Sequence, residues 1–128
     1  MLRLPLLLSL LLAIGCGVAG DGMVAVTGVV HSADGSAIPM ESGTILFIPV
    51  DGARSANGSI EPDGSFTMMT QKPGDGVEPG DYKVILNIWK DYETLTPAVP
   101  ERYADPQTTS LEATVDEDHT RFEFVVDL

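Results

Sequence analysis

Side-chain types that act together in hydrolysis lie close in the sequence at His31, Ser32 and Asp34. A nucleophilic relay needs the imidazole held between the hydroxyl and the carboxylate, and side chains of contiguous turn residues do not adopt that arrangement. The chain also lacks the G-x-S-x-G pattern that presents a nucleophilic serine. The sequence therefore predicts no catalytic residues, and we expect the protein not to be an enzyme.

Candidate metal ligands gather in residues 116–119, where three carboxylates precede His119. On a short hairpin tip these side chains would point into water, so we expect a solvated turn. His31 and His119 lack the spacing of zinc ligands. The neighbouring thioethers of Met68 and Met69 would point to opposite faces of a strand, and one of them is expected in the core. We expect no metal and no cofactor.

A candidate binding surface is formed by aromatic and basic residues near a proline-rich segment, residues 91–109. They are Trp89, Tyr92, Arg102 and Tyr103. Aromatic residues and arginine are enriched in interaction hot spots, which predicts a protein partner. Flat rings also stack on sugars, which predicts an envelope polysaccharide instead. A third interpretation is that Trp89 and Tyr103 fold inward as a small core that anchors the segment.

The charge balance excludes two classes of partner. Seven basic residues oppose nineteen acidic ones, for a net charge of −12. Nucleic acids and anionic lipid head groups require clustered lysine and arginine. We therefore expect no nucleic-acid partner. A single cysteine also allows no disulfide within the chain, so packing must stabilise the fold.

The N-terminal residues are typical of a leader. Arg3 precedes an apolar run in residues 4–16 that ends at Cys16. This run is shorter than the ~20 residues of a membrane-spanning helix and is typical of a secretory signal. A cysteine directly after Ile14 and Gly15 resembles the lipobox of bacterial lipoproteins, although Ala13 stands where that motif usually has a larger aliphatic residue.

The lipoprotein resemblance implies that residues 1–15 are removed and that Cys16 is acylated as the new N-terminus. Residues 16–23 would then be a short tether of ~25 Å at most. Gly17 after the cysteine, instead of aspartate, implies transfer to the outer membrane. The alternative is an ordinary signal cut after Ala19. The remaining domain, residues 24–128, has a size that supports one core.

Seven short β-type runs follow one another, separated by glycine, proline and aspartate turns. They cover residues 24–30, 44–50, 55–60, 65–69, 81–90, 110–115 and 120–128. Such spacing predicts an all-β fold, a seven-stranded antiparallel β-sandwich, with a small barrel as the alternative. Within the fifth run, Val84, Leu86 and Ile88 are expected to share one face.

Three blocks in this order resemble the carboxypeptidase regulatory-like domain. They are residues 26–30 followed by Asp34-Gly35, residues 61–66, and residues 78–84, which contain a Pro-Gly-Asp-Tyr strand entry. The resemblance implies a transthyretin-like Greek-key sandwich without catalytic residues of its own. The hydroxyisourate hydrolases of this fold end in Tyr-Arg-Gly-Ser, whereas this chain ends in Phe-Val-Val-Asp-Leu. Tyr82 is expected to pack its ring and to bond a loop backbone group, as in a tyrosine corner.

These observations predict a lipid-anchored cell-envelope protein that acts as a non-catalytic binding or structural module. A protein partner, docked through a sheet edge or residues 91–109, is the main hypothesis. A carbohydrate-binding module that uses Trp89, Tyr92 and Tyr103 is the alternative.

Overall fold

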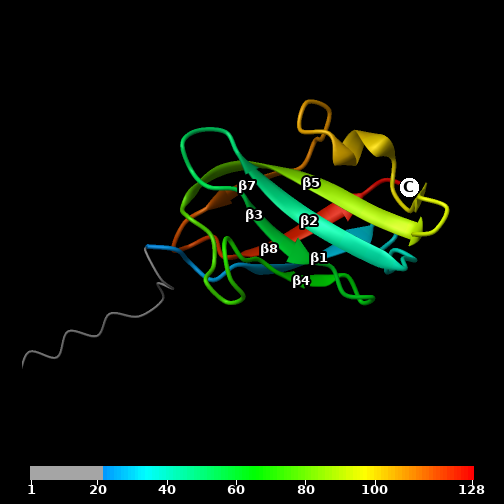
Figure 1. The fold of residues 1–128 in the computed structure, drawn as a ribbon, viewed down its shortest axis with the longest axis horizontal. Coiled ribbons are helices and arrows are strands. Elements are labelled where there is room, and N and C mark those ends of the chain that lie inside the picture. Colours follow the sequence, from blue (N-terminus) through cyan, green and yellow to red (C-terminus); the bar gives the residue numbers. More distant parts are fainter. Residues whose placement is uncertain (1–21) are drawn as a thin grey trace, which may run out of the picture.

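The computed structural model describes residues 22–128 and shows an all-β fold in two sheets (Figure 1). The leader, Cys16 and the expected cleavage sites lie outside the described residues. The elements are β1 (Thr27–Ser32), β2 (Ser42–Pro49), β3 (Ala56–Ser59), β4 (Ser65–Thr67), β5 (Gly80–Asp91), β6 (Thr96–Pro97), the 3-10 helix η1 (Glu101–Ala104), β7 (Glu112–Val115) and β8 (Arg121–Val126). Within residues 22–128, no helix is long and apolar enough to cross a membrane.

One sheet has the strand order β4-β1-β8, and the other has the order β3-β2-β5-β6, with β7 also paired to β5. β5 is the longest strand, and it joins β2 along one edge and both β6 and β7 along the other. The prediction of a wholly antiparallel fold is wrong at one pair, because β1 and β8 run parallel. These strands lie at opposite ends of the domain sequence, so no tight turn constrains their relative direction.

Alternating burial explains why the strands form where they do. In β5, the side chains of Val84, Leu86 and Ile88 are all buried on one face, as predicted. The two sheets meet through aromatic rings. The Phe47 ring on β2 contacts Phe122 and Phe124 on β8 at centroid distances of 5.9 and 6.2 Å. The core therefore lies between the sheets, as in a sandwich and not as in a closed barrel.

The conformation of the turn between β3 and β4 is explained by its residue types. Gly64 has φ +91°, a left-handed conformation that favours glycine. Its N–H donates to the carbonyl of Glu61, and the Asp63 carboxylate accepts the N–H and hydroxyl of Ser65. The turn predicted between the runs at residues 55–60 and 65–69 is confirmed. Isolated antiparallel bridges, Ile60 with Phe66 and Asn57 with Met69, make this segment a hairpin, although β3 and β4 belong to different sheets.

Two strand predictions need correction. The first strand begins at Thr27 and not at residue 24, since Val24 pairs with the loop residue Val77 and not with β4 or β8. Met23, assigned to the tether, is 5 % exposed and packs with the domain. An eighth strand, β6, lies inside residues 91–109, where a loop was expected. Its two residues are too few for side-chain alternation to indicate a strand.

Candidate functional site

A cavity of about 310 Å³ lies where β5, β6 and η1 meet. Most of its walls are apolar, and asparagine, glutamate and aspartate complete them. The lining residues are Leu86, Asn87, Ile88, Trp89, Leu95, Pro97, Val99, Pro100, Glu101, Ala104 and Asp105. Its size is at the lower end of small-molecule pockets, so it suits a single side chain or one sugar unit.

Trp89 is positioned by the end of β5. Its main-chain carbonyl accepts the N–H of Glu41 at 2.8 Å, and it faces Ser42 of β2 in the register. On the other edge it lies opposite Pro97 of β6, next to a register shift between Trp89 and Asp91. Trp89 is therefore half-buried near the end of β5, next to the turn that joins β5 to β6.

The β5–β6 turn holds the rim of the cavity. The Asp91 carboxylate accepts the N–H groups of Glu93 and Thr94 at 3.0 and 3.3 Å. Leu95 follows with φ +53°, which is uncommon for a residue other than glycine, and its side chain is 59 % exposed. An exposed leucine beside Trp89 leaves apolar surface at the cavity mouth.

Tyr103 does not contribute its ring to the surface. It is 2 % exposed, and its hydroxyl oxygen accepts the main-chain N–H of Asp127 at 3.0 Å. The Arg102 guanidinium lies over the ring at 4.7 Å from its centroid and also donates to the Tyr103 hydroxyl at 3.2 Å. Tyr103 therefore links η1 to the C-terminal residues. The C-terminus lies beside η1 in Figure 1.

The four residues predicted as one surface are thus separated. Trp89 lines the cavity, Tyr92 is 59 % exposed on the turn without lining it, and Arg102 is stacked on Tyr103. Sequence reasoning missed the residues that complete the cavity, above all Asn87, Leu95, Val99 and Glu101. Pro97 and Pro100 indicated an irregular segment. No local pattern indicated that this segment folds back over β5.

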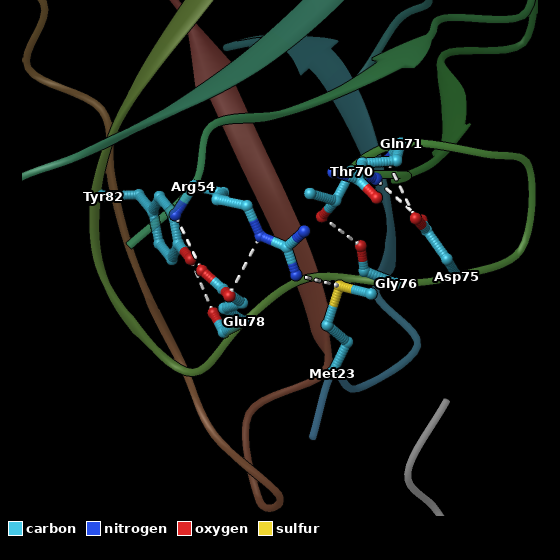
Figure 2. A network of polar contacts seen from close by, with 8 residues as sticks. All are labelled: Met23, Arg54, Thr70, Gln71, Asp75, Gly76, Glu78 and Tyr82. Atoms are coloured by element: carbon cyan, nitrogen blue, oxygen red, sulfur yellow. Dashed lines mark hydrogen bonds and ion pairs between the residues drawn. The ribbon is translucent and has the colours of Figure 1, made fainter. Parts of the chain in front are cut away.

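A buried carboxylate organises the loop before β5 (Figure 2). Asp75 is 5 % exposed and accepts the N–H groups of Thr70, Gln71 and Lys72 at 2.7, 2.8 and 3.1 Å. These hydrogen bonds, led by that of Thr70, hold the pKa of Asp75 below its usual value. The carboxylate therefore stays ionised and is occupied by the backbone, which suits a structural role and not proton transfer.

A second contact set closes the same loop (Figure 2). The Glu78 carboxylate accepts the backbone N–H of Arg54 at 2.7 Å and its Nε–H at 3.1 Å, which lowers the Glu78 pKa. The Tyr82 hydroxyl donates to the Glu78 carbonyl at 2.6 Å. This bond confirms the predicted contact of Tyr82 with a loop backbone group.

The hydrolytic residue types do not form a relay. The Ser32 hydroxyl donates to the Asp34 carboxylate, while the His31 ring bonds Glu123 on β8 and the Ser32 carbonyl, both at 2.8 Å. The Ser32 hydroxyl, followed by Ser36, lowers the pKa of Asp34 to about 2. His31 therefore has no contact with the Ser32 hydroxyl, and the set stabilises the turn after β1.

The metal candidates are local structures as well. His119 Nδ1 lies 2.8 Å from the Asp116 carboxylate across the last hairpin. In the described residues 22–128, no three histidine, cysteine or acidic side chains converge in a way that could hold a metal ion. Met68 is 1 % exposed and belongs to the core, as expected.

A second hollow, of about 270 Å³, lies along β3 and β4. Glu61 is the one titratable residue in its lining, and the others are neutral residues of β3, β4 and the loop that follows. It therefore lacks a pair of groups for acid–base chemistry, and the cavity at Trp89 is the stronger candidate site.

Comparisons of the chain with protein-family models, with curated proteins and with solved structures find no match.

Proposed function

We propose that this protein is a lipid-anchored module of the cell envelope that binds another protein through residues 91–109 and performs no catalysis. The observation that carries the proposal is the cavity at Trp89, which combines exposed apolar surface with a rigid aromatic residue. Aromatic anchors seated in such pockets dominate the energetics of protein interfaces. The polar groups of the other clusters described above are engaged in contacts within the domain, with the backbone or with other side chains.

The proposed anchor rests on the sequence before the domain. Cys16 resembles a lipidated cysteine, and Met23, the first buried residue of the described part of the chain, follows after six intervening residues. The seven Cα–Cα steps from Cys16 to Met23 span ~25 Å at most. A domain anchored in this way would meet partners close to the membrane, and Gly17 favours the outer membrane. The acidic surface favours a basic partner over nucleic acid or anionic lipid.

The proposed fold type is a transthyretin-like, carboxypeptidase regulatory-like sandwich. The two-sheet arrangement, the Gly64 hairpin and the Tyr82 contact are consistent with the three sequence blocks that carry the resemblance. A fold of this type would supply a scaffold, and the site on it would determine the function.

The anchor is tested by replacing Cys16→Ala and measuring incorporation of labelled fatty acid in cells. The proposal requires that labelling is lost. Labelling that persists in the variant contradicts lipidation at Cys16.

The binding role is tested by photo-crosslinking in cells with the reactive residue placed at Leu95. Val50 provides the matched control, because it is 62 % exposed and lies far from Trp89. It follows Pro49 at one end of β2, whereas Trp89 pairs with Ser42 at the other end. A discrete crosslinked protein from Leu95 and none from Val50 is expected. Equal products from both positions, or none from Leu95, would contradict binding through this segment.

A polysaccharide ligand remains the second candidate, because Trp89 shares its cavity with the polar side chains of Asn87, Glu101 and Asp105. A glycan array separates the two. Glycan binding that is lost in Trp89→Ala would favour the sugar, and absence of any binding would exclude it.

A further inference from the structure

We infer that the cavity at Trp89 binds a single lysine or arginine side chain of the partner protein. This inference rests on the proposed binding function and specifies the chemistry that the site recognises. The cavity offers three features that such a side chain requires, namely an apolar wall for its stem, a tryptophan, and two acidic residues in its lining, Glu101 and Asp105.

The stem of a lysine or arginine is a chain of methylene groups that buries itself readily along apolar surface. Here Val99 is 6 % exposed, and Pro97 and Pro100 continue the same wall. The volume of about 310 Å³ suits one long side chain better than a bulky ligand.

The head of the side chain carries a positive charge, and the cavity is suited to it. Trp89 is the best of the aromatic side chains for attracting a cation to its face. The two titratable residues in the lining, Glu101 and Asp105, are both acidic, and lysine and arginine are absent from it.

The neighbouring basic residue does not neutralise these carboxylates. Arg102 lies between them in sequence, but its guanidinium is held over the Tyr103 ring and reaches the Asp127 carbonyl at 3.5 Å. Glu101 is exposed, and no hydrogen bond or ion pair is recorded for its side chain in the described residues. The excess of nineteen acidic over seven basic residues adds a general attraction for a basic segment.

Trp89 provides a direct readout, because the chain contains one tryptophan. The purified full-length protein is titrated with the blocked peptide acetyl-Gly-Ala-Lys-Ala-Gly-amide while tryptophan emission is followed. The matched peptide carries norleucine, which keeps the apolar stem without the charge. We expect the lysine peptide to bind about tenfold more tightly than the norleucine peptide.

Variants separate the pocket from general charge attraction. Glu101→Gln is expected to weaken lysine-peptide binding about fivefold, whereas Glu93→Gln, an exposed position outside the cavity, leaves it within twofold. Trp89→Leu keeps an apolar wall without the ring and is expected to weaken binding. Because this variant has no tryptophan emission, its binding is measured by the NMR shifts of the Leu95 and Ala104 backbone amides. Circular dichroism of each variant checks that the fold is retained.

Four results would overturn the inference. Equal binding of both peptides would indicate a purely apolar pocket, and equal losses in Glu101→Gln and Glu93→Gln would indicate diffuse attraction. A response of Trp89 to maltohexaose but not to the lysine peptide would indicate a sugar site. If crosslinks from Leu95 persist while the lysine peptide fails to bind, the inference fails and the proposed function stands.

Discussion

The hydroxyl of Tyr82 donates a hydrogen bond to the main-chain carbonyl of Glu78, four residues earlier, at 2.6 Å. The Tyr82 ring packs against Phe47 with a centroid distance of 5.6 Å, and the residue is 1 % exposed. One side chain thus joins the loop that contains Asp75 to the core between the sheets. The integrity of this loop depends on a few polar contacts.

Replacing Tyr82→Phe should lower the free energy of unfolding by about 1–2 kcal/mol, because the Glu78 carbonyl loses its donor while the ring remains. Urea unfolding measures the change. The control is Tyr92→Phe, at an exposed position with no recorded hydroxyl contact, which should stay within about 0.5 kcal/mol. Similar losses in both variants would contradict the role of the bond.

Burial, followed by the charges of Glu78 and Asp51, raises the pKa of Tyr82 to about 12 from 10.0. The folded state therefore holds this proton more tightly than the unfolded state. The resulting stability is complete below pH 10 and is lost as the pH rises towards 12. Ultraviolet titration should show one tyrosinate that forms late in the wild type and is missing in Tyr82→Phe. A titration in which all tyrosines ionise near pH 10 would refute this.

Replacing Asp75→Asn should destabilise the loop before β5, because the ionised acceptor of three N–H groups becomes a weaker neutral one. The pKa of Asp75 is lowered from 3.8, so its stabilisation is present above that value and is lost as the pH falls. Wild-type stability should therefore fall more steeply below pH 4 than that of the variant. Asp118→Asn, on the exposed hairpin tip, should behave like the wild type.

The contact between His31 and Glu123 predicts the opposite pH dependence. The Ser32 carbonyl first, and Glu123 second, raise the pKa of His31 above 6.5. The stabilisation is therefore complete below pH 6.5 and is lost as the pH rises through the folded pKa. In Glu123→Gln the pKa of His31, measured by NMR, should fall. It should stay above 6.5, because the Ser32 carbonyl still raises it. An unchanged pKa would show that the ion pair is absent in solution.

Replacing Gly28→Ala should destabilise the β4-β1-β8 sheet by about 1–3 kcal/mol. An added Cβ would meet the Phe122 carbonyl and the Phe66 ring on the two neighbouring strands. Thr27→Ala, at the adjacent exposed position, should change stability by about 0.5 kcal/mol or less. Urea unfolding compares the two variants, and a neutral Gly28→Ala would show that the strands are less closely packed than described.

The alternation of apolar residues predicted much of the fold, because side chains of a strand alternate between two faces. It correctly placed Val84, Leu86 and Ile88 on a buried face and Met68 in the core. Turn residues identified the Gly64 hairpin, since the left-handed conformation at that position favours glycine. Each of these features could be predicted from a local residue pattern, although the burial itself comes from packing against distant strands.

The candidate site was only partly predictable. Trp89 was singled out because it precedes residues 91–109 in the sequence, but the residues that share its cavity, such as Asn87, Val99 and Glu101, were not identified. Tyr103 was offered both as a surface residue and as an inward anchor, and the structure places it inside, bonded to Asp127. A tyrosine in a loop has the same sequence signature in both cases, since its burial depends on what folds over it.

Local residue patterns predicted seven of the strands, the turns between them and the acidic surface, because these follow from backbone preferences and charge, but they did not predict β6. Long-range folding pairs β1 with β8 in parallel, folds β6 and η1 back over β5, and places Trp89 in one cavity with Glu101 and Asp105. The physical reason is that strand pairing and loop docking are selected by long-range packing. Residues far apart in the chain, such as Tyr103 and Asp127, meet only when both sheets have formed.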